Sequence, residues 1–136
     1  MDVMRMRVVI PIEPATKKNS PRIVRAGAFA KVLPSERFTA YQNACAQYLL
    51  PVRPEKPVNE RVEVVCLFYR KTKRRVDLTN LLEAVDDVLV YYGILADDNA
   101  NIIASHDGSR VHLDREHPRT EITIRPLREE DDSMGL

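Results

Sequence analysis

Cysteine is scarce in this chain of 136 residues, with Cys45 and Cys66 as the only two. Two cysteines this far apart exclude a zinc site or a disulfide framework, so we expect two reduced, buried thiols. Long apolar runs are also missing, and none approaches the roughly 20 residues that a membrane-spanning helix needs. The first seven residues lack the apolar stretch of a secretory signal. These absences predict a cytoplasmic protein that makes no contact with a membrane.

A strong net charge is missing too, because the chain carries only +1 at pH 7. Any affinity for nucleic acid must therefore come from local asymmetry of charge rather than from a globally basic protein. That asymmetry is present: residues 70–75 (RKTKRR) hold five cations in six positions, whereas residues 129–132 (EEDD) are all acidic.

The length corresponds to about one domain, and strand and helix patterns alternate along it. Apolar and β-branched residues predict strands at 6–12, 61–69, 100–106 and 119–125, with a short hairpin around Gly27. Helical spacing predicts one helix that starts after an N-cap at Ser35 and continues to Leu49, and a second over 78–91 that ends before Gly93. We therefore predict a single small α+β domain over 1–127, with a mixed sheet of about four strands and two helices. Residues 128–136 are expected to form a flexible acidic tail.

The second helix separates apolar from oxygen-bearing side chains. At 100° per residue its apolar stripe covers about a third of the circumference, and comprises Leu78, Leu81, Leu82, Val85, Val88 and Leu89. On the opposite side Asn80, Glu83 and Asp87 fall within about 60° of one another, and Asp86 lies nearer the stripe. Such a face could line a metal site, but it could equally be the solvated face of an amphipathic helix.

Helix geometry limits which carboxylates can share one ion. Asp77 and Asp87 would lie about 15 Å apart along a continuous helix, too far for ligand distances near 2 Å. Glu83 is about 9 Å along the axis from Asp77, but Asp77 sits at the start of the helix, where the chain can turn back, and glutamate reaches further. The pair Asp97–Asp98, just after the helix, is the natural third contributor. Acidic turn dipeptides are also commonplace, so the pair alone does not establish a site.

The order of these features resembles the RusA family of Holliday-junction resolvases, which are small phage-derived endonucleases. The resemblance is carried by residues 73–81 (KRRVDLTNL), by a helix with further aspartates, and by Gly93 and a hydrophobic pair before Asp97–Asp98. It is close over about 30 residues and looser over most of residues 6–125. It implies a homodimer of α+β subunits, a Mg²⁺ or Mn²⁺ cofactor, and symmetric cuts in branched, four-way DNA junctions during recombination and repair. The implied catalytic aspartates are Asp77 and Asp98.

Two residues within the motif depart from the family pattern. The family usually has a second aspartate where this chain has Thr79, and a lysine where it has Glu83. The exchange removes a short acidic ligand at the helix start and supplies a longer one a turn later. We therefore favour Glu83 as a compensating metal ligand and catalytic residue beside Asp77 and Asp98. The alternative is a lost ligand and a catalytically weak or silent relative that only binds junctions.

The remaining polar residues are assigned supporting roles. Asn80, Asp87 and Asp97 are expected to orient the metal ligands or a metal-bound water. DNA phosphates are expected to meet the basic run and the N-terminal loop, through Lys17, Lys18, Lys71, Lys73, Arg74 and Arg75. The three histidines lack ligand spacing and are interpreted as surface or structural residues.

Overall fold

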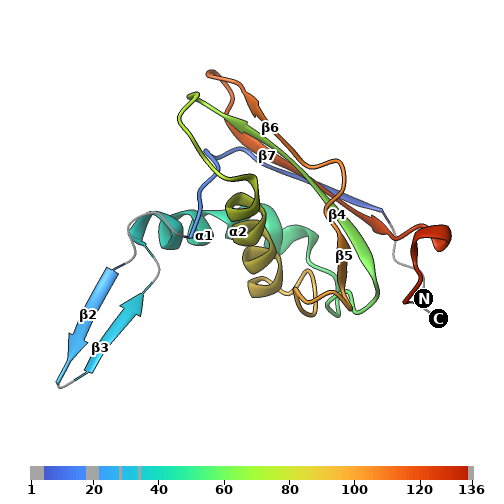
Figure 1. Ribbon diagram of the computed structural model, residues 1–136, viewed down its shortest axis with the longest axis horizontal. Coiled ribbons are helices and arrows are strands. Elements are labelled where there is room, and N and C mark those ends of the chain that lie inside the picture. The colour runs from blue at the N-terminus through green and yellow to red at the C-terminus, as the bar shows by residue number, and fades with distance from the viewer. Residues whose placement is uncertain (1–4, 18–21, 28, 34, 135–136) are drawn as a thin grey trace.

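The structure, a computed structural model, describes residues 5–17, 22–27, 29–33 and 35–134 (Figure 1). Within it, residues 22–26 and 29–33 are described as backbone only. Lys18, one of the residues predicted to bind DNA, lies outside the described residues.

A five-stranded mixed sheet forms the centre of the domain. Its strands are β1 (Met6–Ile10), β4 (Val62–Arg70), β5 (Ile103–Ser105), β6 (Arg110–Leu113) and β7 (Arg119–Pro126). The order is β1-β7-β4, with β5 and β6 both paired to the remaining edge of β4. The pairings of β7 with β1 and with β4 are antiparallel, whereas those of β4 with β5 and with β6 are parallel.

Two helices, α1 (Glu36–Leu49) and α2 (Leu78–Tyr91), lie side by side against one face of this sheet (Figure 1). Successive side chains along each strand point to opposite faces of the sheet. The apolar side chains point to the helices and the polar ones point to the other face. The buried set on the helix side includes Val8, Ile10, Val64, Cys66, Phe68, Ile122 and Ile124. On the other face Arg119 lies over the ring of Tyr69, 3.8 Å from its centroid, and bonds Glu121 at 2.7 Å.

Helix α1 begins at the predicted cap. The Ser35 hydroxyl accepts a hydrogen bond from the backbone N–H of Phe38 at 3.1 Å, which satisfies one of the unpaired donors of the first turn. Phe38, Tyr41, Cys45 and Leu49 form its buried face. A short 3₁₀ turn (Leu50–Val52) with Pro51 then ends the helical segment.

Helix α2 connects β4 to β5 and has the bounds that the sequence predicts. Asp77 is its N-cap, and the helix ends at Tyr91, with Tyr92 as its C-cap. The next residue, Gly93, has a φ of +73°, which favours glycine. The N–H of Ile94 donates to the carbonyl of Leu89 at 2.9 Å, as in a Schellman ending. The chain turns sharply there, and Asp97 and Asp98 follow six and seven residues after the last helical residue, Tyr91.

The hairpin predicted around Gly27 consists of β2 (Arg22–Ala26) and β3 (Phe29–Leu33), which pair only with each other in the described part of the chain. It extends away from the sheet in Figure 1.

The α+β prediction is confirmed, with two corrections to the sheet. The third predicted strand, 100–106, is only three residues long, because Asn99 begins a turn in which its side chain accepts from the N–H of Asn101 at 2.9 Å. Strand β6 was missed, since Arg110, Val111, His112 and Leu113 are all exposed and show no buried face. The division at residue 127 remains a prediction, although Arg61 Nε lies 2.7 Å from Asp132 Oδ1, beyond that boundary.

Both cysteines are buried and unpaired, as expected. Among the residues that the structure describes, no helix is long and apolar enough to cross a membrane.

Candidate functional site

The basic run forms the loop between β4 and α2. Lys71, Lys73, Arg74 and Arg75 are all exposed. Two contacts fix the loop: the N–H of Lys71 donates to Glu13 Oε2 at 3.1 Å, and Arg70 Nη1 donates to the carbonyl of Arg74. Four cations are therefore held on a defined loop that leads directly to Asp77.

Asp77 is exposed at the start of α2. Its carboxylate makes no capping hydrogen bond to the first turn, although its backbone carbonyl accepts from the N–H groups of Asn80 and Leu81. The side-chain amide of Asn80 donates to Asp77 Oδ2 at 3.3 Å. The supporting role predicted for Asn80 is therefore compatible with this contact, and Asp77 retains carboxylate oxygen for another partner.

Asp98 lies among other carboxylates. Its N–H donates to Asp97 Oδ1 at 2.7 Å. The pKa of Asp98 is raised by partial burial, and then by the Asp97 side chain and the charge of Asp87. The end of α2 and the turn after Leu95 thus bring Asp87 close to Asp97 and Asp98, which follow it by ten and eleven residues.

Asp86 and His106 belong to the same region and were not predicted as site residues. Asp86 Oδ2 lies 2.8 Å from His106 Nε2, while His106 Nδ1 lies 2.8 Å from the carbonyl of Val64. The pKa of Asp86 is raised by burial; His106 opposes this shift, whereas the charges of Asp98 and Asp87 add to it. Its other oxygen, Oδ1, is buried and has no hydrogen-bond partner in the described part of the chain.

We call Asp86, Asp87, Asp97 and Asp98 the acidic cluster. The sequence predicted Asp87, Asp97 and Asp98 as site residues, but the only signal for Asp86 was its position near the apolar stripe of α2. Its partner His106 directly follows β5 and lies 20 residues away in sequence. His106 joins α2 to β4 through its contacts with Asp86 and the Val64 carbonyl, and the structural role predicted for it is compatible with these contacts. Its pKa is raised because Asp86 and the Val64 carbonyl outweigh the opposing effect of burial.

Lys17 reaches the acidic cluster from the N-terminal loop. Its Nζ forms an ion pair with Asp87 Oδ2, and it lies 5.9 Å from the centroid of the Phe38 ring. Lys17 therefore neutralises part of the acidic cluster, and a role in DNA binding stays a prediction for this residue.

Glu83 and Thr79 are exposed on α2. In the described part of the chain, no hydrogen bond or ion pair joins Glu83 to Asp77 or to Asp98. Its assignment as a metal ligand stays a prediction.

The donor chemistry suits a divalent cation. Carboxylate oxygens are the ligands that Mg²⁺ and Mn²⁺ prefer. The pKa values of Asp86 and Asp98 are raised mainly by burial and further by the neighbouring carboxylates, and a bound cation would favour the charged forms of both. Over the described ranges, however, no group of three or more carboxylate, imidazole or thiol side chains is already arranged around a single point. The residues fit the ion by chemistry, and the ion would have to draw them together.

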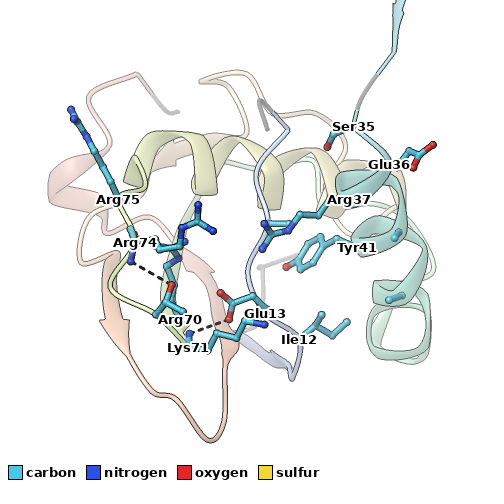
Figure 2. Close-up of a pocket in the computed structure, with 14 residues that line it drawn as sticks. Ile12, Glu13, Ser35, Glu36, Arg37, Tyr41, Arg70, Lys71, Arg74 and Arg75 are labelled. Atoms are coloured by element: carbon cyan, nitrogen blue, oxygen red, sulfur yellow. Dashed lines mark hydrogen bonds between the residues drawn. The ribbon is translucent and has the colours of Figure 1, made fainter. Parts of the chain in front are cut away.

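A cleft of about 1100 Å³ opens on one side of the basic loop. The first turns of α1 form one wall and the loop forms the other, with Ile12, Glu13 and Ala15 between them. In Figure 2 the side chains of Arg37 and Arg74 reach into it from opposite walls, whereas Arg75 points away. A smaller hollow of about 340 Å³ separates the loop from β6 on its other side.

The family model for endodeoxyribonuclease RusA matches residues 11–125. No curated protein matches the chain. The matched range contains the basic loop, both predicted catalytic aspartates and the whole acidic cluster. The chain therefore belongs to the endodeoxyribonuclease RusA family.

Proposed function

We propose that this protein is a divalent-metal-dependent endonuclease that cuts four-way DNA junctions during recombination and repair. The observation that carries the proposal is the acidic cluster around Asp98, which one helix connects to Asp77 and to the basic loop before it. The proposed phosphate-binding and cation-binding residues thereby lie in one continuous segment, from the end of β4 through α2 to the turn before β5.

Asp77 and Asp98 would hold Mg²⁺ or Mn²⁺, with Glu83 as a third ligand in place of the carboxylate that Thr79 lacks. The bound ion supplies a water of lowered pKa and neutralises charge on the phosphoryl group. Asn80 positions the Asp77 carboxylate through its 3.3 Å hydrogen bond. Asp97 fixes the backbone of Asp98, and Asp87 adds negative charge beside it.

The basic loop would bind backbone phosphates of the DNA strand that enters the active site. Lys73, Arg74 and Arg75 are exposed within four residues of Asp77, and their contacts are independent of base sequence. Selectivity for junctions then comes from DNA shape and from two active sites in a homodimer.

Labelled four-way junctions and linear duplexes of the same sequence provide the test, with Mg²⁺ and with chelator. We expect paired nicks in the junction that require the metal and are absent from the duplex. Failure to cut any branched substrate at high enzyme excess contradicts the proposal.

A catalytically silent junction-binding relative is the second candidate, favoured by Thr79 and by the absence of a ready-made three-ligand group among the described residues. It predicts junction binding that weakens steeply with salt, with no cleavage in Mg²⁺ or Mn²⁺. Replacing Asp98 by Asn would then alter only the binding constant.

A further inference from the structure

The cleft beside α1 has a strongly cationic lining. Five of its lining side chains are cations and two are acidic: Arg37, Arg70, Lys71, Arg74 and Arg75 against Glu13 and Glu36. Glu13 already accepts the N–H of Lys71, and Glu36 and Arg75 both point away from the hollow in Figure 2, which leaves four cations against one acid. The free space is therefore bordered by positive charge, which favours an anion.

Arg70 shows what kind of group is missing. It lies at the end of β4, and its Nη1 donates to the Arg74 carbonyl, but its Nε is buried and has no acceptor in the described part of the chain. A buried donor on a cationic group is costly to leave unpaired. Arg70 also lines the cleft, so a phosphate bound there would place negative charge beside its guanidinium group.

The opposite wall adds donors from a helix start. Ser35, Glu36 and Arg37 all line the cleft, and the first N–H groups of an α-helix have no partner within the helix. Ser35 Oγ accepts from the N–H of Phe38, and Arg37 lies in the first turn of α1, where the positive end of the helix dipole favours an anion. Arg37 is exposed and forms no ion pair among the described residues.

The position of the cleft ties it to the candidate active site. Arg74 precedes Asp77 by three residues, so the two lie within about 10 Å of extended chain. A single strand rises about 3.4 Å per base, so a strand at Asp77 reaches this cleft within about three nucleotides.

We propose that this cleft seats a backbone phosphate of the DNA strand that passes the active site, held between Arg37 of α1 and Arg70 of β4. The inference rests on the proposed function for its substrate, branched DNA. It assigns phosphate binding to Arg37, which lies outside the basic run and the N-terminal loop, and to Arg70, the first residue of the basic run, which was not among the predicted DNA-binding residues. The proposed DNA-binding surface therefore extends from the basic loop to α1. Lys17 is not part of it, because its ammonium group is paired with Asp87.

The test measures junction binding in chelator, in an Asp98→Asn background so that nothing is cut. Kd for a labelled four-way junction is measured over a series of salt concentrations, for Arg37→Gln and for the control Arg128→Gln. The control removes the same charge from a side chain that is 66% exposed and paired with Asp131, beyond β7. Circular dichroism melting confirms that each variant is folded, and Arg70→Gln serves as a second variant.

We expect Arg37→Gln to raise Kd about threefold to tenfold and to reduce the slope of log K against log salt by about 0.9, the loss of one phosphate contact. The control should change neither. An unchanged slope in folded Arg37→Gln and Arg70→Gln overturns the inference.

Cleavage by the unmodified protein is scored separately with Mg²⁺. If the unmodified protein cuts and the salt slope of both variants is unchanged, the phosphate-binding role of the cleft is contradicted and the nuclease proposal is not. A reduced slope without cutting supports the cleft and contradicts the nuclease.

Discussion

At the scale of single residues, the acidic cluster holds its carboxylates in surroundings that disfavour their charged forms. The pKa of Asp98 is raised by burial first, and then by the side chain of Asp97 and the charge of Asp87. A residue kept in such an unfavourable field is typical of a functional site, where stability is traded for binding or catalysis. Two consequences can be measured without any assay of cleavage.

The first concerns the Asp98 carboxylate. Asp98→Asn removes one charge from the cluster, so the metal-free protein should melt up to about 3 °C higher, a small shift because the group is exposed and screened. Differential scanning calorimetry in chelator checks this, with Glu55→Gln as a matched change outside the cluster. A lower melting temperature for Asp98→Asn alone would show that the carboxylate is stabilising and not strained.

The second concerns His106 and Asp86. The pKa of His106 is raised in the folded state, so the stability it contributes is complete below its ordinary pKa of about 6.5 and is lost as pH rises through the raised value. The raised pKa of Asp86 acts in the same direction, because the folded state again binds the proton more readily.

Metal-free protein should therefore become more stable as pH falls through the raised pKa of His106 toward its ordinary value of about 6.5. Urea unfolding at several pH values measures the effect, which His106→Gln should reduce in this range and His117→Gln, at an exposed histidine, should leave in place. The same pH dependence in His106→Gln would assign it to other groups.

At the scale of elements, the ending of α2 sets the position of the acidic cluster. Gly93 has a φ of +73°, and an added Cβ would contact Arg53 Cδ at 3.4 Å. The turn that follows carries the chain to Asp97 and Asp98. Sequence alone identified this ending, because a glycine directly after an apolar periodic segment is a strong helix stop.

Gly93→Ala should destabilise the protein by about 1–2 kcal/mol, the cost of a left-handed conformation for a residue with a Cβ. Gly93→Asn should cost less, since asparagine tolerates that conformation. Equilibrium urea denaturation of both variants measures the difference. Equal losses for alanine and asparagine would mean that crowding against Arg53, and not backbone conformation, limits the position.

Other elements escaped prediction for physical reasons. Helix α2 and strands β4 and β7 have strong apolar periodicity, and their bounds were predicted closely. Strand β6 has no buried residue, so its pairing with β4 leaves no hydrophobic pattern to detect. The contact between Asp86 and His106 joins a helix to a loop 20 residues away, and only the parallel arrangement of β4 and β5 around α2 creates it.

At the scale of the whole molecule, one edge of the domain combines the basic loop, the cleft and the α2 start. The sequence predicted the loop cations and the aspartates, because both are dense and local. It did not predict that α1 supplies Arg37 to the same cleft, since helix packing alone brings residues 37 and 74 to facing walls.

The predicted role of Glu83 as a metal ligand can be tested directly, because this chain has Thr79 and Glu83 where its family usually has aspartate and lysine. If it replaces the carboxylate lost at Thr79, Glu83→Gln should raise the Mn²⁺ concentration needed for half-maximal binding by about tenfold, a typical loss for a group that supports a metal site. Isothermal titration calorimetry measures this, and Thr79→Asp in the Glu83→Gln protein should restore it. An unchanged affinity in Glu83→Gln would leave Asp77 and Asp98 without this third ligand.

The central claim is that Asp77 and Asp98 work in one metal-dependent site. The most direct measurement is single-turnover cleavage of a labelled four-way junction in saturating Mg²⁺ by Asp77→Asn, Asp98→Asn and the control Glu55→Gln. We predict that each aspartate variant is slower by at least about 100-fold, as for the loss of a group that acts in the transition state, while the control keeps the full rate. An Asp77→Asn protein that cuts as fast as the control would contradict the account.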